Sequence, residues 1–169
     1  MGSIYYFWRS FNLNNMSAIV VRSFEDFNQY LGQSLGQSTS HKVTQSQIDK
    51  FADATLDHQW IHIDHERAKQ GPFGMTIAHG YLTLSMVPHM WEQILQAENL
   101  KMMVNYGIDK LKFGQHVPVG SEIVLKAKLE NLTNLRGVIK AEVGARMEIV
   151  GSPKPVFTAT LVLLYHFHE

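Results

Sequence analysis

The chain has 169 residues, which at about 150 residues per domain predicts a single domain. Its 15 basic and 15 acidic residues cancel, and the absence of a basic run argues against a nucleic-acid partner, whose phosphates require a positive surface. No cysteine is present, which excludes disulfides, a thiolate nucleophile and cysteine-ligated zinc, so acid–base chemistry falls to other side chains, among them nine histidines. This composition is that expected of a cytoplasmic protein.

The first sixteen residues are expected to lie outside the folded domain. They include the aromatic run YYFW, but no basic segment precedes it and no cleavage site follows, so a signal peptide is not expected. Gly2 would suit myristoylation, but Tyr6 stands where that motif needs Ser or Thr. Residues 1–16 are therefore predicted to be a disordered extension or the product of an upstream start codon, with Met16 as the functional start; an interaction arm is the alternative. Residues 17–169 are predicted to form the domain.

Two helices are predicted in the next part of the chain. Ser23 is expected to cap a short helix over residues 23–31, whose apolar residues have helical spacing. A turn rich in Gly, Ser and Gln then leads into a strand that ends near Val43. The sequence TQSQ at residues 44–47 is a capping box, which predicts a second helix that ends near Leu56.

A long buried helix is expected to follow a mostly irregular, histidine-rich stretch over residues 57–73. Residues 70–91 lack formal charges and would be long enough to cross a bilayer, but their Gly, Pro, His and Thr are too polar for a membrane span. Thr76 is instead predicted to cap a helix that runs to about Ala97. Pro88 removes one backbone hydrogen bond from that helix and should kink it.

The last third of the chain changes to the period-two pattern of strands. Strands are predicted over residues 102–113, 122–130, 138–149 and 156–167, with turns at residues 131–137 and 151–155. Alternating strands joined by short turns indicate an antiparallel sheet with one covered face. Because the preceding apolar helix needs a surface to pack on, the sequence predicts an α+β fold in which a curved antiparallel sheet wraps around one long central helix.

The first candidate site is the segment FADATLDHQWIHID, residues 51–64. Asp57 and His62 follow a predicted helix, and a turn containing Gln59 and Trp60 can bring both side chains to one point. A carboxylate and an imidazole aimed at one water form a proton-transfer pair. The alternative is structural: Asp57 is a turn residue and His62 its hydrogen-bonded neighbour.

The same segment raises the question of a metal site. His58 and His62 are four residues apart, which suits zinc only if the helix continues and a third ligand arrives. His65 has the wrong spacing to supply that ligand. No metal is therefore expected.

The second candidate site is FGMTIAHGYLTLS, residues 73–85. If Thr76 caps the helix, His79 and Gly80 lie at the end where backbone N–H groups have no internal partner. Gly80 has no side chain to block an approaching oxygen, so a carbonyl held there would be polarised by the N–H group and the positive helix end. The alternative is a close helix contact that requires glycine.

Together the two motifs resemble the MaoC-like dehydratases, the (R)-specific enoyl-CoA hydratases of the hot-dog fold. The family pattern is Phe-Ala-x-x-Thr-Gly-Asp-x-x-x-x-His-x-Asp, followed by Phe-Gly-x-x-Ile-Ala-His-Gly. The sequence DHQWIH at residues 57–62 resembles the corresponding motif in the branch that includes nodulation protein N-like members. The resemblance spans roughly residues 21–167, and it implies a single hot-dog domain.

The resemblance also implies roles for individual residues. Asp57 and His62 would be the catalytic pair, and the backbone N–H of Gly80 would bind the thioester carbonyl. Leu56 replaces the usual family glycine, and its bulk beside Asp57 bears on substrate size. Further substrate contacts are expected from Leu56, Trp60, Phe73, His79 and Ser85.

The implied activity is the (R)-specific hydration of trans-2-enoyl thioesters, or the reverse dehydration of 3-hydroxyacyl thioesters, with no metal and no cofactor besides the CoA or acyl carrier protein of the substrate. A hot-dog thioesterase is the first alternative, but many of these place an acidic residue on the central helix, and residues 76–91 contain none. A non-catalytic acyl-thioester-binding subunit is the second, although a binder needs no proton-transfer pair. A homodimer or higher oligomer without membrane or nucleic-acid partners is expected, because the sheet leaves an edge strand exposed and the resemblance puts the acyl channel at the dimer interface.

Overall fold

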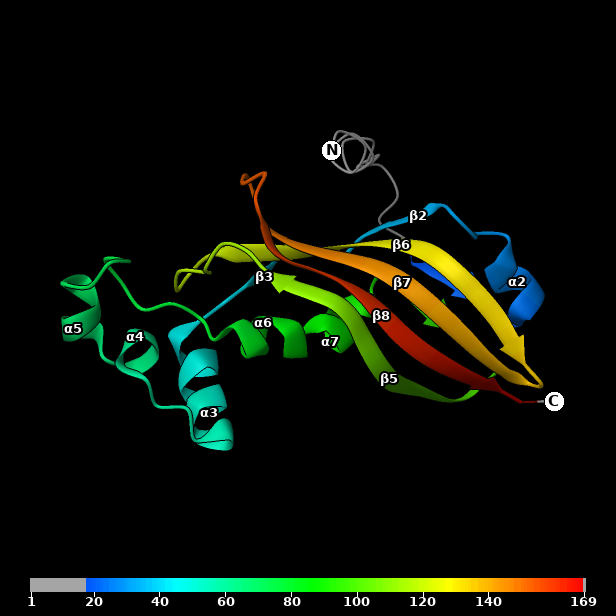
Figure 1. Cartoon of the computed structure of the whole chain (residues 1–169), viewed down its shortest axis with the longest axis horizontal. Coiled ribbons are helices and arrows are strands. Elements are labelled where there is room, and N and C mark those ends of the chain that lie inside the picture. Colours follow the sequence, from blue (N-terminus) through cyan, green and yellow to red (C-terminus); the bar gives the residue numbers. More distant parts are fainter. Residues whose placement is uncertain (1–17, 169) are drawn as a thin grey trace.

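A curved antiparallel sheet forms the outer layer of the protein in a computed structural model that describes residues 18–168 (Figure 1). The predicted extension at residues 1–16 lies outside this range. The strand order is β2–β6–β7–β8–β5, and β3 also pairs with β6. The strands are β2 (Ser34–Gln37), β3 (His41–Lys42), β5 (Leu100–Phe113), β6 (Glu122–Leu135), β7 (Val138–Ile149) and β8 (Pro155–Phe167).

The helices lie inside the curve of the sheet and beyond one of its ends. Helices α6 and α7 pack beneath the sheet, whereas α3, α4 and α5 extend past its end, and α2 lies at the opposite end (Figure 1). A parallel pair of short strands, β1 (Ile19–Val21) and β4 (Leu95–Ala97), stands apart from the main sheet. The helices are α2 (Phe24–Asn28), α3 (Gln45–Thr55), α4 (Trp60–Ile63), α5 (His65–Lys69), α6 (Gly80–Ser85) and α7 (Val87–Trp91).

The period-two pattern correctly predicted which strand residues face the helices. On β6 the residues Ile123, Leu125, Ala127 and Leu129 are fully buried, and the alternate residues of β7 share that core. Trp91 of α7 packs into the same core, where its indole Nε1 donates to the Tyr165 hydroxyl at 2.8 Å. The predicted α+β architecture, a curved antiparallel sheet around central helical structure, is confirmed. No helix within residues 18–168 has the length and apolar character needed to cross a membrane.

The central helix is shorter than the predicted range from Thr76 to Ala97 and is divided into two segments. His79, and not Thr76, is the N-cap of α6, and α6 gives way to α7 between Ser85 and Val87. Met86, the residue between the two helices, has φ −80° and ψ −11°, and the N–H groups of Met86 and Met90 donate to the carbonyls of Leu82 and Met86. The interruption therefore lies in the turn before Pro88, which lacks the N–H that would bond to the Leu84 carbonyl, as the sequence predicted. After α7 the chain turns into β4.

Two irregular segments were also predicted too broadly. The stretch 57–73 contains the short helices α4 and α5. The predicted turn at 131–137 belongs mostly to β6, and only Arg136 and Gly137 separate β6 from β7. Both have positive φ, 55° and 97°, the conformation of the two-residue turns that match strand twist. The β1–β4 pair was not predicted, because three-residue strands carry too little pattern.

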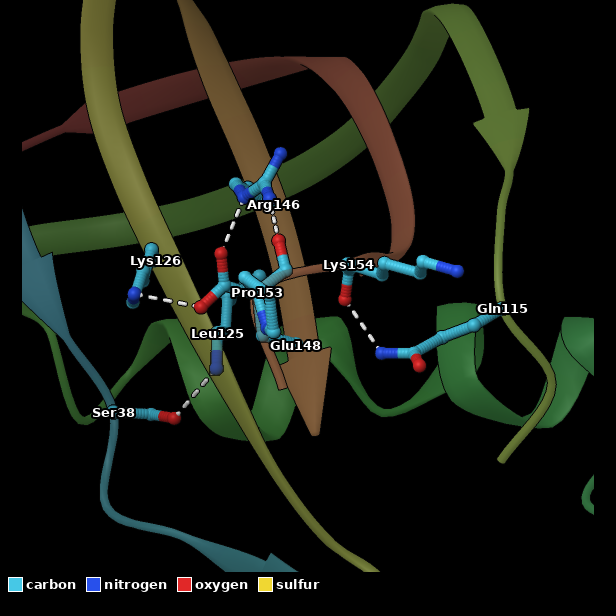
Figure 2. Close-up of polar contacts among 8 residues, drawn as sticks. All are labelled: Ser38, Gln115, Leu125, Lys126, Arg146, Glu148, Pro153 and Lys154. Carbon is cyan, nitrogen blue, oxygen red and sulfur yellow. Dashed lines mark hydrogen bonds and ion pairs between the residues drawn. The ribbon is translucent and has the colours of Figure 1, made fainter. Parts of the chain in front are cut away.

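A buried ion cluster lies on the outer face of the sheet, where β6 and β7 pair (Figure 2). The Glu148 carboxylate accepts hydrogen bonds from Lys126 Nζ, at 2.7 Å, and from Arg146 Nε. Arg146 also donates to the carbonyl oxygen of Pro153 at 2.8 Å, so the turn between β7 and β8 covers the cluster. The Arg146 and Glu148 residues are only 8% and 9% exposed. Every charge of this cluster is paired inside the protein.

Candidate active site

Asp57 follows the end of helix α3, where the C-cap residue has an unusual backbone conformation. The predicted capping box at its start is confirmed, with the Thr44 hydroxyl accepting from the Gln47 backbone N–H. The helix ends at Leu56, which has φ 62° and ψ 18°, the left-handed conformation. A side chain with a Cβ pays about 1–2 kcal/mol for that conformation. Leu56 is nevertheless 81% exposed, so no packing contact compensates the strain.

Gln45, in the first turn of α3, holds the two motif segments together. Its amide nitrogen donates to the backbone carbonyl of His62 at 2.8 Å, and its amide oxygen accepts from the Thr76 hydroxyl at 2.6 Å. Thr76 therefore has a structural role, although it was predicted to cap the central helix. Sequence reasoning missed Gln45, because its partners lie 17 and 31 residues further along the chain.

His62 is buried, and its ring orientation is determined by a hydrogen bond. Nδ1 lies 2.7 Å from the carbonyl oxygen of Ile77, and a carbonyl can only accept, so Nδ1 carries the proton and Nε2 is left with a free lone pair. Burial is the main cause that lowers the pKa of His62 below the ordinary 6.5, and the neighbouring His79 lowers it further against the opposing effects of the Ile77 hydrogen bond and Asp57. The imidazole is therefore neutral near pH 7.

His79 lies against both members of the predicted catalytic pair. Its ring stacks on that of His62 with centroids 3.7 Å apart and planes 25° apart. Its Nε2 donates to the backbone carbonyl of Asp57 at 3.0 Å and lies 4.0 Å from the Asp57 carboxylate. Its Nδ1 is buried without a hydrogen-bond partner among the residues described. Phe51 covers the ring as well, at a centroid distance of 5.1 Å.

The structure thus brings Asp57, His62 and His79 together, each with one polar atom within 4.8 Å of the others. A single water with hydrogen bonds of about 2.8 Å can bridge two atoms up to about 5.6 Å apart, so one water fits between the Asp57 carboxylate and the His62 ring. The spacing would also admit a metal ion. Stacked rings, however, direct their lone pairs along nearly parallel planes, which is a poor arrangement for two imidazoles on one ion.

Gly80 is the first residue of α6, so its N–H has no intrahelical partner, and it makes no hydrogen bond to any of the described residues. A Cβ placed on this residue would lie only 3.2 Å from the ring of Phe113. Both interpretations of the glycine are therefore compatible with the geometry, because close packing against Phe113 leaves the N–H open.

A cavity of about 270 Å³ adjoins Gly80 and His62. One side of the cavity is formed by the segment that follows β5, and the sequence analysis did not predict this side. Nothing in the local pattern marks that segment, because only the pairing of β5 with β8 carries Phe113 to α6. The lining residues are Ile61, His62, Ile77, Ala78, Gly80, Thr83, Phe113, Gly114, Gln115, His116, Val117 and Val156.

The other predicted substrate contacts do not line this cavity. Trp60 lies under the guanidinium of Arg67, whose central carbon is 4.4 Å from the ring centroid. Phe73 packs on the His116 ring at 4.6 Å. The exposed Ser85 donates its hydroxyl hydrogen bond to the carbonyl of Tyr81 within α6.

Comparisons with known proteins show the family to which this chain belongs. Residues 26–149 match the model of the MaoC-like domain. The 3-hydroxyacyl-thioester dehydratase Z of Mycobacterium tuberculosis is 41% identical over 149 residues, a match that covers 86% of this chain and 99% of that protein. Nodulation protein N of Rhizobium leguminosarum is 37% identical, over 86% of this chain and 92% of its own.

Comparison with solved structures also finds a hydratase. The unliganded (R)-hydratase of Pseudomonas aeruginosa superimposes with a TM-score of 0.67 at 17% identity, over 82% of this chain and 83% of that one. At this identity the superposition supports the hot-dog architecture. With a family model that spans most of the chain and a relative at 41% identity over nearly its whole length, this protein belongs to the MaoC-like dehydratase family.

Proposed function

We propose that the protein is a 3-hydroxyacyl-thioester dehydratase, a hydro-lyase that also catalyses the (R)-specific hydration of trans-2-enoyl thioesters. Its similarity to the M. tuberculosis dehydratase supports the reaction class. The observation that carries the proposal is the neutral His62, which has a ring nitrogen within 4.8 Å of an Asp57 carboxylate oxygen, a spacing that one water can bridge, beside a cavity that Gly80 borders.

The chemistry follows from the electronic structure of the substrate. The carbonyl of an enoyl thioester withdraws electrons from the conjugated double bond, which makes C3 electrophilic. A hydrogen bond from the Gly80 N–H to the carbonyl oxygen stabilises the negative charge that develops there as water attacks C3. A donor of this kind typically contributes about 3 kcal/mol to the transition state.

Asp57 and His62 carry out the proton transfers. The pair holds the water, takes one proton from it as the C3–O bond forms, and returns a proton to C2 as the enolate collapses. Water is thereby added across the double bond, and the thioester remains intact. Because one water is held on one face of the substrate, oxygen and proton arrive from that face, which accounts for a single product stereoisomer.

The direct experiment is incubation of the protein with trans-2-enoyl-CoA. Loss of enoyl absorbance is followed next to a thiol reagent, and the product is offered to (R)- and (S)-specific 3-hydroxyacyl dehydrogenases. We expect hydration without thiol release and oxidation by the (R)-specific enzyme. Thiol release without hydration would identify a thioesterase. An (S) product would mean that the opposite face of the substrate meets the water and that the carbonyl does not lie at Gly80.

We also infer a homodimer that forms through β5. This strand pairs with β8 on one side and with no other described strand, so it is an edge of the sheet. Edge strands are usually paired or covered. The side chains along β5 include an unusual number of exposed large hydrophobics: Met102, Val104, Tyr106, Ile108 and Phe113. Phe113 also lines the cavity, so a partner on this edge would lie next to the site.

Light scattering on the purified full chain tests the dimer. We expect twice the chain mass at micromolar concentration, and a monomer after the substitution Ile108→Asp, which places a charge on the apolar edge. The substitution Asp53→Asn on the exposed surface of α3 is the control and should leave the mass unchanged. A monomeric wild-type protein with full activity would refute the inference.

A further inference from the structure

His79 is a buried side chain that contacts both members of the proposed catalytic pair, yet it does not line the cavity. It is 2% exposed, between the ring of Phe51 on one side and that of His62 on the other. Although sequence reasoning placed it among the substrate contacts, its surroundings leave no open face for a substrate. The role of His79 therefore depends on its contacts with Asp57 and His62.

The first of these contacts fixes Asp57. The Asp57 carboxylate is 55% exposed and makes no hydrogen bond to the described residues, so its position depends on its backbone. That backbone follows the left-handed Leu56, where the helix has ended. The hydrogen bond from His79 Nε2 to the Asp57 carbonyl, at 3.0 Å, is the side-chain contact that holds the backbone at this point.

The second contact fixes the ring of His62. The bond from Nδ1 to the Ile77 carbonyl anchors one edge of that ring but leaves it free to tilt about the bond. The His79 ring, stacked at 3.7 Å, blocks the tilt on one side. His79 is also bonded directly to Gly80 in the chain, so one residue connects the carboxylate, the imidazole and the N–H donor of the site.

We infer that His79 is a positioning residue, which aligns Asp57 through its backbone carbonyl and His62 through ring stacking so that both face one water. The inference rests on the proposed function, because it assigns the purpose of these contacts to the hydration reaction. Misplacing a reacting group by about 1 Å can cost on the order of 100-fold in rate. The loss should fall on kcat, since the substrate does not touch His79.

A set of matched variants tests this role. His79→Phe keeps a ring against His62 and Phe51 but removes the donor, whereas His79→Gln places an amide N–H where Nε2 lies. We expect His79→Phe to lower kcat by about 10- to 100-fold with KM nearly unchanged. His79→Gln restores the donor but loses the stacked ring, so it should recover part of that loss and remain below the wild type. Thermal melting and light scattering establish that each variant is folded and has the wild-type mass.

The variants are then combined with Asp57→Asn. If His79 acts through Asp57, His79→Phe should cause no further loss of kcat in the Asp57→Asn background, because residues of one unit are not additive. Should His79→Phe fail to fold, His79→Gln is compared with His79→Asn, which is one methylene too short to reach the carbonyl. Gln should remain active and Asn should not.

Three results would overturn the inference. A wild-type kcat in His79→Phe, or equal activities of the Gln and Asn variants, would show that the hydrogen bond is dispensable. A rise in KM with kcat unchanged would make His79 a substrate contact. An equal loss in the wild-type and Asp57→Asn backgrounds would indicate a purely structural role. Failure of the proposed function is distinguishable, since the wild-type protein would then not hydrate enoyl-CoA at all, and failure of the catalytic pair would leave hydratase activity in Asp57→Asn or His62→Gln alone.

Discussion

The proposed catalytic cluster of Asp57, His62 and His79 and the outer ion cluster of Lys126, Arg146 and Glu148 each contain two buried titratable residues beside a more exposed one, but they differ in how their polar atoms are satisfied. In the ion cluster every charge meets an opposite charge or a carbonyl, and a turn closes over it. In the proposed catalytic cluster one imidazole nitrogen is buried without a hydrogen-bond partner within residues 18–168, another keeps a free lone pair, and the carboxylate faces solvent.

This difference in hydrogen bonding indicates that the ion cluster contributes to stability and the proposed catalytic cluster to function. A buried polar group without a partner costs free energy, so an arrangement that leaves such groups open must be maintained by the packing around it. Here Gln45 and the rings of Phe51 and His79 provide that packing. In the ion cluster, by contrast, the charged groups are already paired with one another and with a carbonyl, so they do not offer a site for a ligand. Substitutions in the two clusters should therefore affect different measurements.

The largest effect is expected from the catalytic pair. Asp57→Asn and His62→Gln should each lower turnover by about 10²- to 10⁴-fold, the usual contribution of a general acid–base group. Because both groups act on one water, the double variant should be little worse than either single one. Steady-state kinetics on an enoyl thioester measures the losses, and thermal melting should find the fold intact. Losses that multiply would show that the two residues serve separate steps.

The opposite outcome is expected for the ion cluster. Glu148→Gln removes the carboxylate that accepts from both Lys126 and Arg146, and breaking a buried ion pair typically costs about 3 kcal/mol of unfolding free energy. Turnover at a temperature where the variant is folded should equal that of the wild type. Denaturant unfolding measures the first quantity and the enoyl assay the second.

A matched control is available on the same strand. Glu142 accepts a hydrogen bond from Lys140 at 2.6 Å, but at the surface of β7, where water screens the charges. Glu142→Gln should therefore lower the unfolding free energy much less than Glu148→Gln. An equal loss from both variants would mean that burial does not distinguish the two pairs.

The smallest expected effect is a gain in stability beside the catalytic pair. Leu56→Gly would relieve about 1–2 kcal/mol of left-handed strain, less about 0.5–1 kcal/mol for the greater chain entropy of glycine when unfolded. The net gain should be about 0.5 kcal/mol. Leu56→Ala retains a Cβ and should gain nothing, which makes it the control. Denaturant midpoints at equal slope measure both, and a loss in the glycine variant would mean that the Leu56 side chain makes a stabilising contact.

Sequence patterns predicted the sheet more completely than the helices. Apolar residues recur at every second position from Ile123 to Leu129 in β6 and from Ile139 to Met147 in β7, so the face that packs on the core could be predicted from the sequence. The central helix was predicted too long, because apolar residues from Thr76 to Ala97 satisfy helical spacing whether or not the helix is interrupted before Pro88. Hydrophobic period alone cannot distinguish a continuous helix from two short ones.

Within the site, the local motifs were predictable and the contacts between them were not. Asp57, His62 and Gly80 were singled out by residue type and spacing. The hydrogen bond of His79 to Asp57 spans 22 residues, and Phe113 reaches Gly80 only through the register of β5 on β8. Such contacts depend on the assembled fold, and no short segment of sequence encodes them.

The position of α3, α4 and α5 beyond the end of the sheet has a consequence for how the protein opens (Figure 1). This arm can detach without unpairing β6, β7 or β8, and partial openings of this kind need less free energy than global unfolding. Each opening would carry His62 away from Gly80 while the sheet stays intact. Amide hydrogen exchange would therefore be faster in the arm than in the sheet, and heat would inactivate the enzyme before it melts the core.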